Sequence, residues 1–171
     1  SNLQISSSVQ VPGSYMHSGV FAFISSGGSI SDLRIDGLEI TSDAKAGASG
    51  FVGRARDSFD LSSLFFNGVE QSSLSQYSGG LIGVAELTQN SVVTNISLEA
   101  QMDCSTSETF SSCGGVIGYV STIPNETNNG IRKVFADIDF VALGANTSSD
   151  IGGLAGMAVC TSGSPSLLLE D

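Results

Sequence analysis

Three cysteines are the residues of this chain whose chemistry depends most directly on spacing. Cys104 and Cys113 flank the short loop 105–112. In an oxidising compartment, a disulfide that closes such a loop contributes roughly 2 to 4 kcal/mol to stability. Cys160 is then left over, and its place beside Val159 favours a small buried hydrophobic residue over an intermolecular link. The cysteines do not have a spacing typical of a zinc site. The sequence therefore predicts one disulfide, between Cys104 and Cys113.

Three asparagines stand in sequons for N-linked glycosylation: Asn95, Asn125 and Asn146. Asn125 and Asn146 fall in long loops, where a bulky sugar is accommodated. Asn95 lies at the start of an expected strand and must point outward between Val93 and Ile96 to be used. We expect N-linked glycans as covalent partners of the chain, and occupied sequons would indicate a eukaryotic source.

The acidic residues outnumber the basic ones, 17 against 6, which gives a net charge of −11. This balance excludes nucleic acid as a natural partner, because phosphate binding needs clustered Lys and Arg. We expect the charge to serve solubility. Calcium binding is the alternative, since Asp137 and Asp139 share a strand face and Asp57 and Asp60 share a turn. Two carboxylates supply at best half of a calcium site, so no metal or cofactor is predicted.

Residues for enzyme chemistry are scarce. The single histidine, His17, has no Ser and Asp neighbours in the order of a known catalytic triad. The carboxylates are dispersed, and the glycine-rich phrases lack the Gly-Lys-Ser/Thr of a phosphate-binding loop. The sequence predicts no catalytic residues and no enzyme, with a carbohydrate-active β-helix as a distant alternative.

A short glycine-rich phrase recurs five times and indicates the fold class. Its second residue recurs at intervals of 31, 30, 35 and 38 residues, at Gly19, Gly50, Gly80, Gly115 and Gly153. Periods of this length are typical of solenoids and arrays. We interpret the phrase as a short strand bounded by glycines at tight corners, and each repeat as two strands joined by loops.

A second phrase follows each of the first four anchors, and its apolar residues have a period of two after an opening step of three. The apolar positions are Ile30, Leu33, Ile35; Leu61, Leu64, Phe66; Val93, Ile96, Leu98; and Ile131, Val134, Ala136. A period of two places these side chains on one face of a strand. We expect Ile35, Phe66, Leu98 and Ala136 to stack in one interior column. Their neighbours Arg34, Phe65, Ser97 and Phe135 should point outward.

These phrases resemble the GLUG-type repeats, glycine-rich β-solenoid repeats of cell-surface proteins. The resemblance rests on Gly79-Gly80-Leu81-Ile82-Gly83 and its copies, and on segments such as 29–35, and it covers residues 18–160. The first copy departs from the pattern with Ala22 in place of glycine. The resemblance implies a surface location and a scaffold or adhesive role, with no catalytic residues to transfer.

The predicted architecture is all-β, a parallel β-helix or β-solenoid of about four to five rungs with irregular end segments. The solenoid spans residues 18–160. Residues 1–17 form a cap or a donor strand, because positions 3 to 11 alternate before Pro12-Gly13. Residues 161–171 form a C-terminal segment. Open sheet edges at the first and last rungs must be covered, by this chain or by another.

The function expected from these features is non-enzymatic and extracellular. We expect a subunit of a surface filament that assembles head to tail with copies of itself. A monomeric adhesin or glycan-binding module is the alternative, although the chain has no Trp and only three Tyr as sugar platforms. No apolar run approaches the roughly 20 residues of a membrane-spanning helix. No signal peptide is apparent, so a secreted protein would be represented here in mature or trimmed form.

Overall fold

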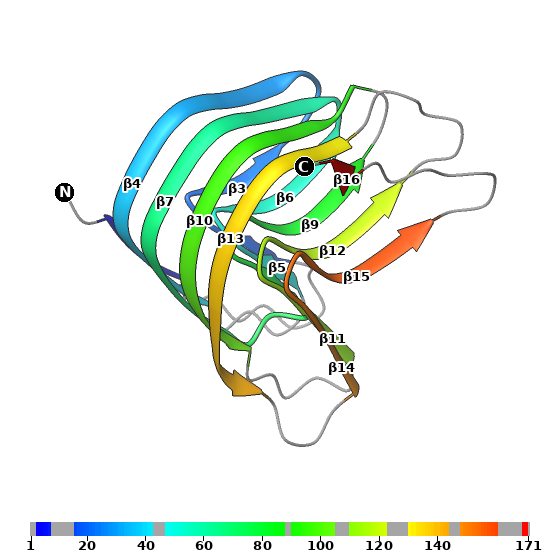
Figure 1. Cartoon of the computed structure of the whole chain (residues 1–171). Helices are drawn as coiled ribbons and strands as arrows, with labels where there is room; N and C mark the ends of the chain where they lie inside the picture. The colour runs from blue at the N-terminus through cyan, green and yellow to red at the C-terminus, as the bar shows by residue number, and fades with distance from the viewer. Residues whose placement is uncertain are drawn as a thin grey trace.

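The computed structural model describes residues 3–7, 16–42, 47–87, 90–104, 110–122, 130–143, 148–160 and 169–170. These residues contain strands and no helices, and neighbouring strands in each sheet are parallel and joined by hydrogen bonds. The chain winds as a parallel β-solenoid (Figure 1). The predicted fold class is confirmed.

Three parallel sheets form the walls of the solenoid. The long sheet contains β1 (Leu3–Ser7), β4 (Gly28–Ser42), β7 (Phe59–Ser73), β10 (Val92–Cys104), β13 (Gly130–Leu143) and β16 (Leu169–Glu170). The second sheet contains β2 (Met16–Ser18), β5 (Gly47–Ser49), β8 (Tyr77–Gly79), β11 (Phe110–Gly114) and β14 (Ser148–Gly152). The third contains β3 (Phe21–Ile24), β6 (Val52–Asp57), β9 (Ile82–Leu87), β12 (Ile117–Thr122) and β15 (Ala155–Cys160).

Each complete rung therefore consists of three strands, where the sequence predicted two. The extra strand is the short one of the second sheet, which precedes each glycine anchor. The anchor phrase is a corner and not a strand, because the chain bends at Gly50 and Phe51 between β5 and β6. Figure 1 shows the long strands as one curved wall, with the two short sheets meeting on the opposite side.

The long strands bend at a column of residues in the left-handed region. Asp32, Ser63, Asn95 and Lys133 have φ values of 55°, 54°, 55° and 49°, and they follow register-matched residues in adjacent strands. Asp, Asn and Ser tolerate this conformation better than most residues, because their short polar side chains bond locally. The bend explains the opening step of three, since one residue at the corner interrupts the alternation of the strand.

Glycines at the other corner allow neighbouring rungs to approach closely. A Cβ added at Gly80 would lie 2.6 Å from the carbonyl oxygen of Gly115 in the following rung. The last glycine of the phrase packs on the preceding rung, since a Cβ at Gly118 would lie 2.7 Å from the backbone nitrogen of Ser78. The first copy has no preceding rung at this corner among the described residues, which explains why Ala22 is accommodated there.

The predicted interior column forms in register. Ile35 pairs with Phe66, Phe66 with Leu98, and Leu98 with Ala136. Phe66 and Leu98 are buried, whereas the outward Phe65 and Phe135 are 45% and 69% exposed. Ala136 is exposed, contrary to the prediction, because β13 is the last long strand and only β16 pairs beyond it, at Ile131 and Arg132.

The N-terminal strand pairs with this chain's own long sheet. β1 runs parallel to β4, from Leu3 beside Leu38 to Ser7 beside Ser42. In this structure it therefore covers the second half of β4 at the outer edge of the long sheet. The first rung begins at Met16, two residues before the predicted boundary. Residues 8–11 of the predicted alternation lie outside the described residues.

Candidate functional site

The cysteine pair lies at the inner edge between rungs three and four. Cys104 ends β10 and Cys113 lies in β11, and the two residues form a disulfide with a Cα–Cα separation of 6.2 Å. This is the pair to which the sequence points. Cys160 ends β15, and its side chain lies outside the described part of the structure.

Buried serines occupy the equivalent positions in the first two rungs. Ser42 Oγ donates to Ser18 Oγ at 3.1 Å, and Ser49 Oγ donates to Ser73 Oγ at 2.7 Å. Gln71 Nε2 also donates to Ser49 Oγ at 2.8 Å. The hydrogen bonds offset the cost of burying these polar groups. Sequence reasoning missed this ladder, although Ser18, Ser49 and Ser78, each directly before the first glycine of its phrase, were a usable signal.

The sequons differ in what the structure shows of them. Asn95 is exposed at the left-handed corner of β10, while Val93 and Ile96 are buried on either side. Its Nδ2 donates to Ser63 Oγ at 3.2 Å in the neighbouring rung. Asn125 and Asn146 lie outside the described residues.

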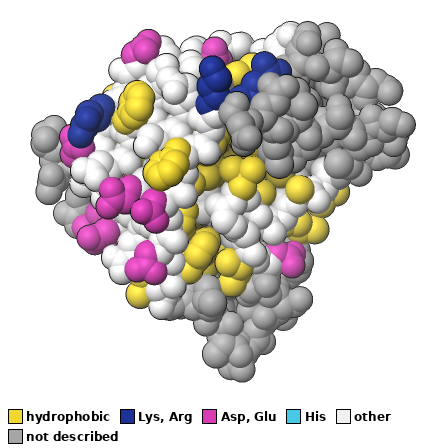
Figure 2. All heavy atoms as spheres, viewed as in Figure 1, with side chains coloured by type: hydrophobic (Ala, Val, Ile, Leu, Met, Phe, Trp, Pro, Cys, Tyr) yellow, Lys and Arg dark blue, Asp and Glu magenta, His cyan; other side chains and the backbone are white. Residues whose placement is uncertain are grey.

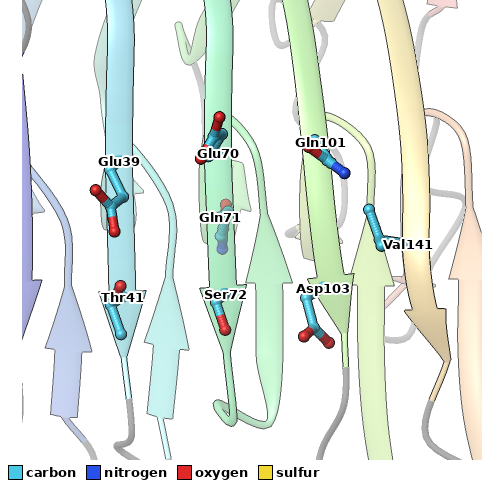
Figure 3. A pocket seen from close by; sticks show the side chains of 8 residues that line it. All are labelled: Glu39, Thr41, Glu70, Gln71, Ser72, Gln101, Asp103 and Val141. Atoms are coloured by element: carbon cyan, nitrogen blue, oxygen red, sulfur yellow. The ribbon is translucent and has the colours of Figure 1, made fainter.

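Carboxylates gather on the outer face of the long sheet. Glu39 and Glu70 are register partners, and so are Glu99 and Asp137. Figure 2 shows acidic side chains clustered over the flank formed by the long strands. In Figure 3, Glu39, Glu70 and Gln101 stand side by side on β4, β7 and β10, above Thr41, Ser72 and Asp103. Like charges in adjacent register positions repel, so this face carries unfavourable electrostatics.

The acidic face does not form a metal centre within the part of the chain that the structure describes. No group of three or more His, Cys, Asp or Glu side chains has the arrangement needed to hold a metal ion there. Asp137 and Asp139 project outward on β13, and Asp57 and Asp60 lie at the β6–β7 corner. On this face Arg34 donates to Asp36 at 3.2 Å, and this hydrogen bond lowers the pKa of Asp36.

His17 lies in β2, apart from the acidic face. Burial lowers the pKa of His17, the charge of Arg54 lowers it further, and Glu86 opposes both. Arg54 of β6 forms a salt bridge with Glu86 of β9. The charges that act on His17 are thus those of an ion pair that links two rungs.

A shallow hollow on the outer face is flanked by exposed aromatic rings. Phe65 and Phe135 line it, together with Arg34, Asn67 and Asp137. Phe65 and Phe135 share the outward column with Arg34 and Ser97. The hollow combines apolar rings with the carboxylates of Glu99 and Asp137 and one cation.

The N-terminal end of the solenoid exposes apolar side chains that belong to the core columns or lie beside them. Phe21 and Phe23 of β3 are 41% and 48% exposed. Ile30, Leu33 and Ile35 of β4 are only half-buried, because β1 covers β4 only from Leu38 onward. The edges of β2 and β3 have no further strand paired beyond them in the described structure.

The C-terminal end is open in the same way. Ile151 of β14 is 40% exposed, and Leu154, Met157 and Val159 are half-buried. β14 and β15 are the outermost strands of their sheets. Within the described residues, no strand pairs beyond Leu154, Met157 and Val159.

Comparisons with known proteins identify no relative. The chain matches no family model, and searches of curated proteins and of solved structures find no match. The resemblance to GLUG-type repeats therefore remains a prediction. Within the described residues, no helix is long and apolar enough to cross a membrane.

Proposed function

We propose that this protein is a non-enzymatic structural solenoid of the cell surface or extracellular space, which assembles head to tail into a filament. The observation that carries the proposal is that, among the residues that the structure describes, both ends of the solenoid leave core columns partly exposed and strand edges unpaired. Burying apolar surface stabilises an association by roughly 25 cal/mol per Å². Different surfaces at the two ends favour an open polymer over a closed ring when the rotation does not close.

Two variants with one blocked end each test the filament. Phe23→Glu places a charge on the N-terminal end, and Ile151→Glu places one on the C-terminal end. Each variant alone should sediment as a single subunit, whereas a mixture of the two should form dimers through the remaining intact ends. Phe65→Glu, on the outer face, is the control and should polymerise like the unaltered chain. A chain that sediments as a single subunit at every concentration would refute the filament.

An adhesive or ligand-binding module is the second candidate, and the exposed Phe65 and Phe135 favour it. The ring of Phe135 is 69% exposed, and its contact with water is unfavourable. The ring therefore offers a contact surface to an apolar group or to the face of a sugar. Phe135→Ala should then abolish adherence to cells or glycans without a change in sedimentation. If the Phe135→Ala variant and the unaltered chain adhere equally well, the adhesive function through Phe135 is refuted.

The extracellular location rests on the disulfide pair and the sequons. Disulfides persist in oxidising compartments. Intact-mass and peptide mass spectrometry of the native protein should find hexosamine on Asn95, Asn125 or Asn146. Free thiols at Cys104 and Cys113 in the native protein would contradict the location.

A further inference from the structure

The last anchor glycine has no steric reason within the described chain to be glycine. In the earlier rungs, a Cβ at the anchor would collide with a carbonyl of the following rung, as at Gly80. A Cβ at Gly153 would meet nothing within 4 Å, and its φ is outside the left-handed region. Gly153 thus has the form of a corner on which a further rung packs.

The two ends of the chain also carry complementary parts of one rung. At the C-terminal end, β14 and β15 are complete, and β16 pairs with Ile131 and Arg132 near the start of β13. At the N-terminal end, β1 pairs with the second half of β4. Placed together in chain order, β14 and β15 supply two walls of one rung, and β16 and β1 supply the beginning and the last part of the third.

We propose that copies of this chain join through a composite rung, made of β14, β15 and β16 of one copy and β1 of the next. In this joint the corner formed by residues 152–154 faces the shorter corner of Gly19 and Val20 in the next copy, so Gly153 approaches the backbone of that corner, much as Gly115 packs on the backbone of Gly153 within one copy. The inference rests on the proposed head-to-tail assembly and specifies how the two ends fit.

The existing registers fix which residues meet at the joint. Extending the second sheet places Asp150 beside His17 and Ile151 beside Ser18 of the next copy. Extending the third sheet places Ala155 beside Phe21 and Met157 beside Phe23. Asp150 then lies beside His17. The thioether of Met157 lies beside the exposed ring of Phe23, which is a favourable contact. The joint therefore matches small residues to large ones without placing like charges together.

Direct stacking of β13 on β4 of the next copy is the competing joint. It would continue the long-sheet columns and place Asp139 beside Glu39, a like-charge pair. It is also obstructed, because β1 already occupies the outer edge of β4 and β16 occupies that of β13. The composite rung uses these two strands instead of displacing them.

Ala22 is the one residue that limits the fit. The equivalent Gly53 packs on the preceding rung, where a Cβ would lie 2.9 Å from the backbone nitrogen of Ser18. In the joint, the methyl group of Ala22 would meet the backbone of Ile151 in the preceding copy. Removing this methyl group should allow the two copies to approach more closely.

Two substitutions distinguish an effect on the joint between copies from an effect on the stability of the single subunit. Gly153→Ala adds a methyl group that touches nothing among the described residues of the single subunit, so the unfolding free energy should not fall, while the association constant should fall by about tenfold or more. Ala22→Gly should raise the association constant. Sedimentation velocity over a concentration series measures both effects. A Gly153→Ala protein that assembles as well as the unaltered chain would overturn the composite rung.

Cross-linking then identifies which strands meet. In a Cys160→Ser background, Met157→Cys combined with Phe23→Cys places thiols at register partners about 4.8 Å apart across the joint, within reach of a disulfide. These residues lie at opposite ends of one copy, so the expected product is a covalent ladder of copies. Asp139→Cys with Glu39→Cys reports direct stacking, and ladders from this pair alone would overturn the composite rung while leaving the filament intact. If no variant associates, the proposed function itself fails.

Discussion

Cys104 and Cys113 bond at columns that hydrogen-bonded serines occupy in the earlier rungs. Cys113 is the register partner of Ser78, which pairs with Ser49, and Cys104 follows Asp103, the register partner of Ser72. Ser73 and Ser49 are joined by a hydrogen bond of 2.7 Å. The same inner edge of the solenoid is therefore fastened by hydrogen bonds in two rungs and by a covalent bond in the next.

Replacing both cysteines by serine should destabilise the protein without unfolding it. A disulfide that closes a loop of this length contributes about 3 kcal/mol through the entropy of the unfolded chain. Serine is already the residue at these columns, so the packing tolerates the change. Urea unfolding of Cys104→Ser/Cys113→Ser measures the difference. An unchanged midpoint would show that the disulfide does not restrain the unfolded chain.

The neighbouring phenylalanines of β7 should respond in opposite ways to truncation. Phe66 is 2% exposed, and its ring packs on Phe51 with the centroids 4.8 Å apart. Phe66→Ala should cost about 3 to 5 kcal/mol, because it leaves a cavity in the core. Phe65→Ala, on the outer face, should change stability by about 0.5 kcal/mol or less. Comparable losses for both variants in chemical denaturation would contradict the register.

Lys133 is the least favourable residue in the left-handed column. A non-glycine residue at a φ of 49° carries strain of about 1 kcal/mol, and Lys lacks the short polar side chain that compensates Asp32 and Asn95. Lys133→Gly should therefore raise the melting temperature. Arg132→Gly, one residue earlier in the same strand, is the control and should lower it. If Lys133→Gly and Arg132→Gly both lower the melting temperature, the left-handed φ of Lys133 is not a source of strain.

Charge repulsion on the outer face should be measurable at low ionic strength. Glu70 lies between Glu39 and Gln101 in register. Glu70→Gln should stabilise the protein by about 0.2 to 1 kcal/mol in low salt, and Gln101→Glu should destabilise it by a similar amount. Both differences should shrink in high salt, where exposed charges are screened. Thermal unfolding at two salt concentrations tests the pair, and salt-independent differences would require another explanation.

The protonation of His17 should make stability fall in mild acid. Burial and Arg54 lower the pKa of His17 in the folded chain below its ordinary value of about 6.5. The unfolded chain therefore binds the proton more readily between the two values. Stability should be complete above pH 6.5 and decrease as the pH falls below it. Unfolding free energies at low protein concentration should show this decrease for the unaltered chain and a smaller one for His17→Gln.

Alternation and repetition made most of the long sheet predictable. Leu64, Phe66 and Leu98 follow the strand period, so their burial and the exposure of Phe65 could be read from neighbouring residues. The exposure of Ala136 could not, because it depends on where stacking stops, and the pattern within one repeat contains no such information.

The second sheet and the pairing of β1 with β4 escaped prediction for a different reason. β5 is three residues long, and its Ser49 is satisfied by Gln71 and Ser73 from a distant strand, so no apolar alternation marks it. The Cys104–Cys113 pair could be predicted from the spacing and chemistry of the cysteines alone. The partner of β1 could not be predicted, since an alternating strand pairs equally well with its own chain or with another.

The fixed corners divide the molecule into a constant part and a variable part. The glycine corner and the left-handed column recur in each of the first four rungs, whereas the extra residues of the later repeats fall between β9 and β10, β10 and β11, β12 and β13, and β13 and β14. Segments inserted between β10 and β11 or between β13 and β14 would lie at the corner where the long sheet meets the second sheet, and those between β12 and β13 at the corner where the third sheet meets the long sheet. The solenoid can thus carry different inserted peptides at these junctions, spaced by the distance between rungs, while the three sheets stay unchanged.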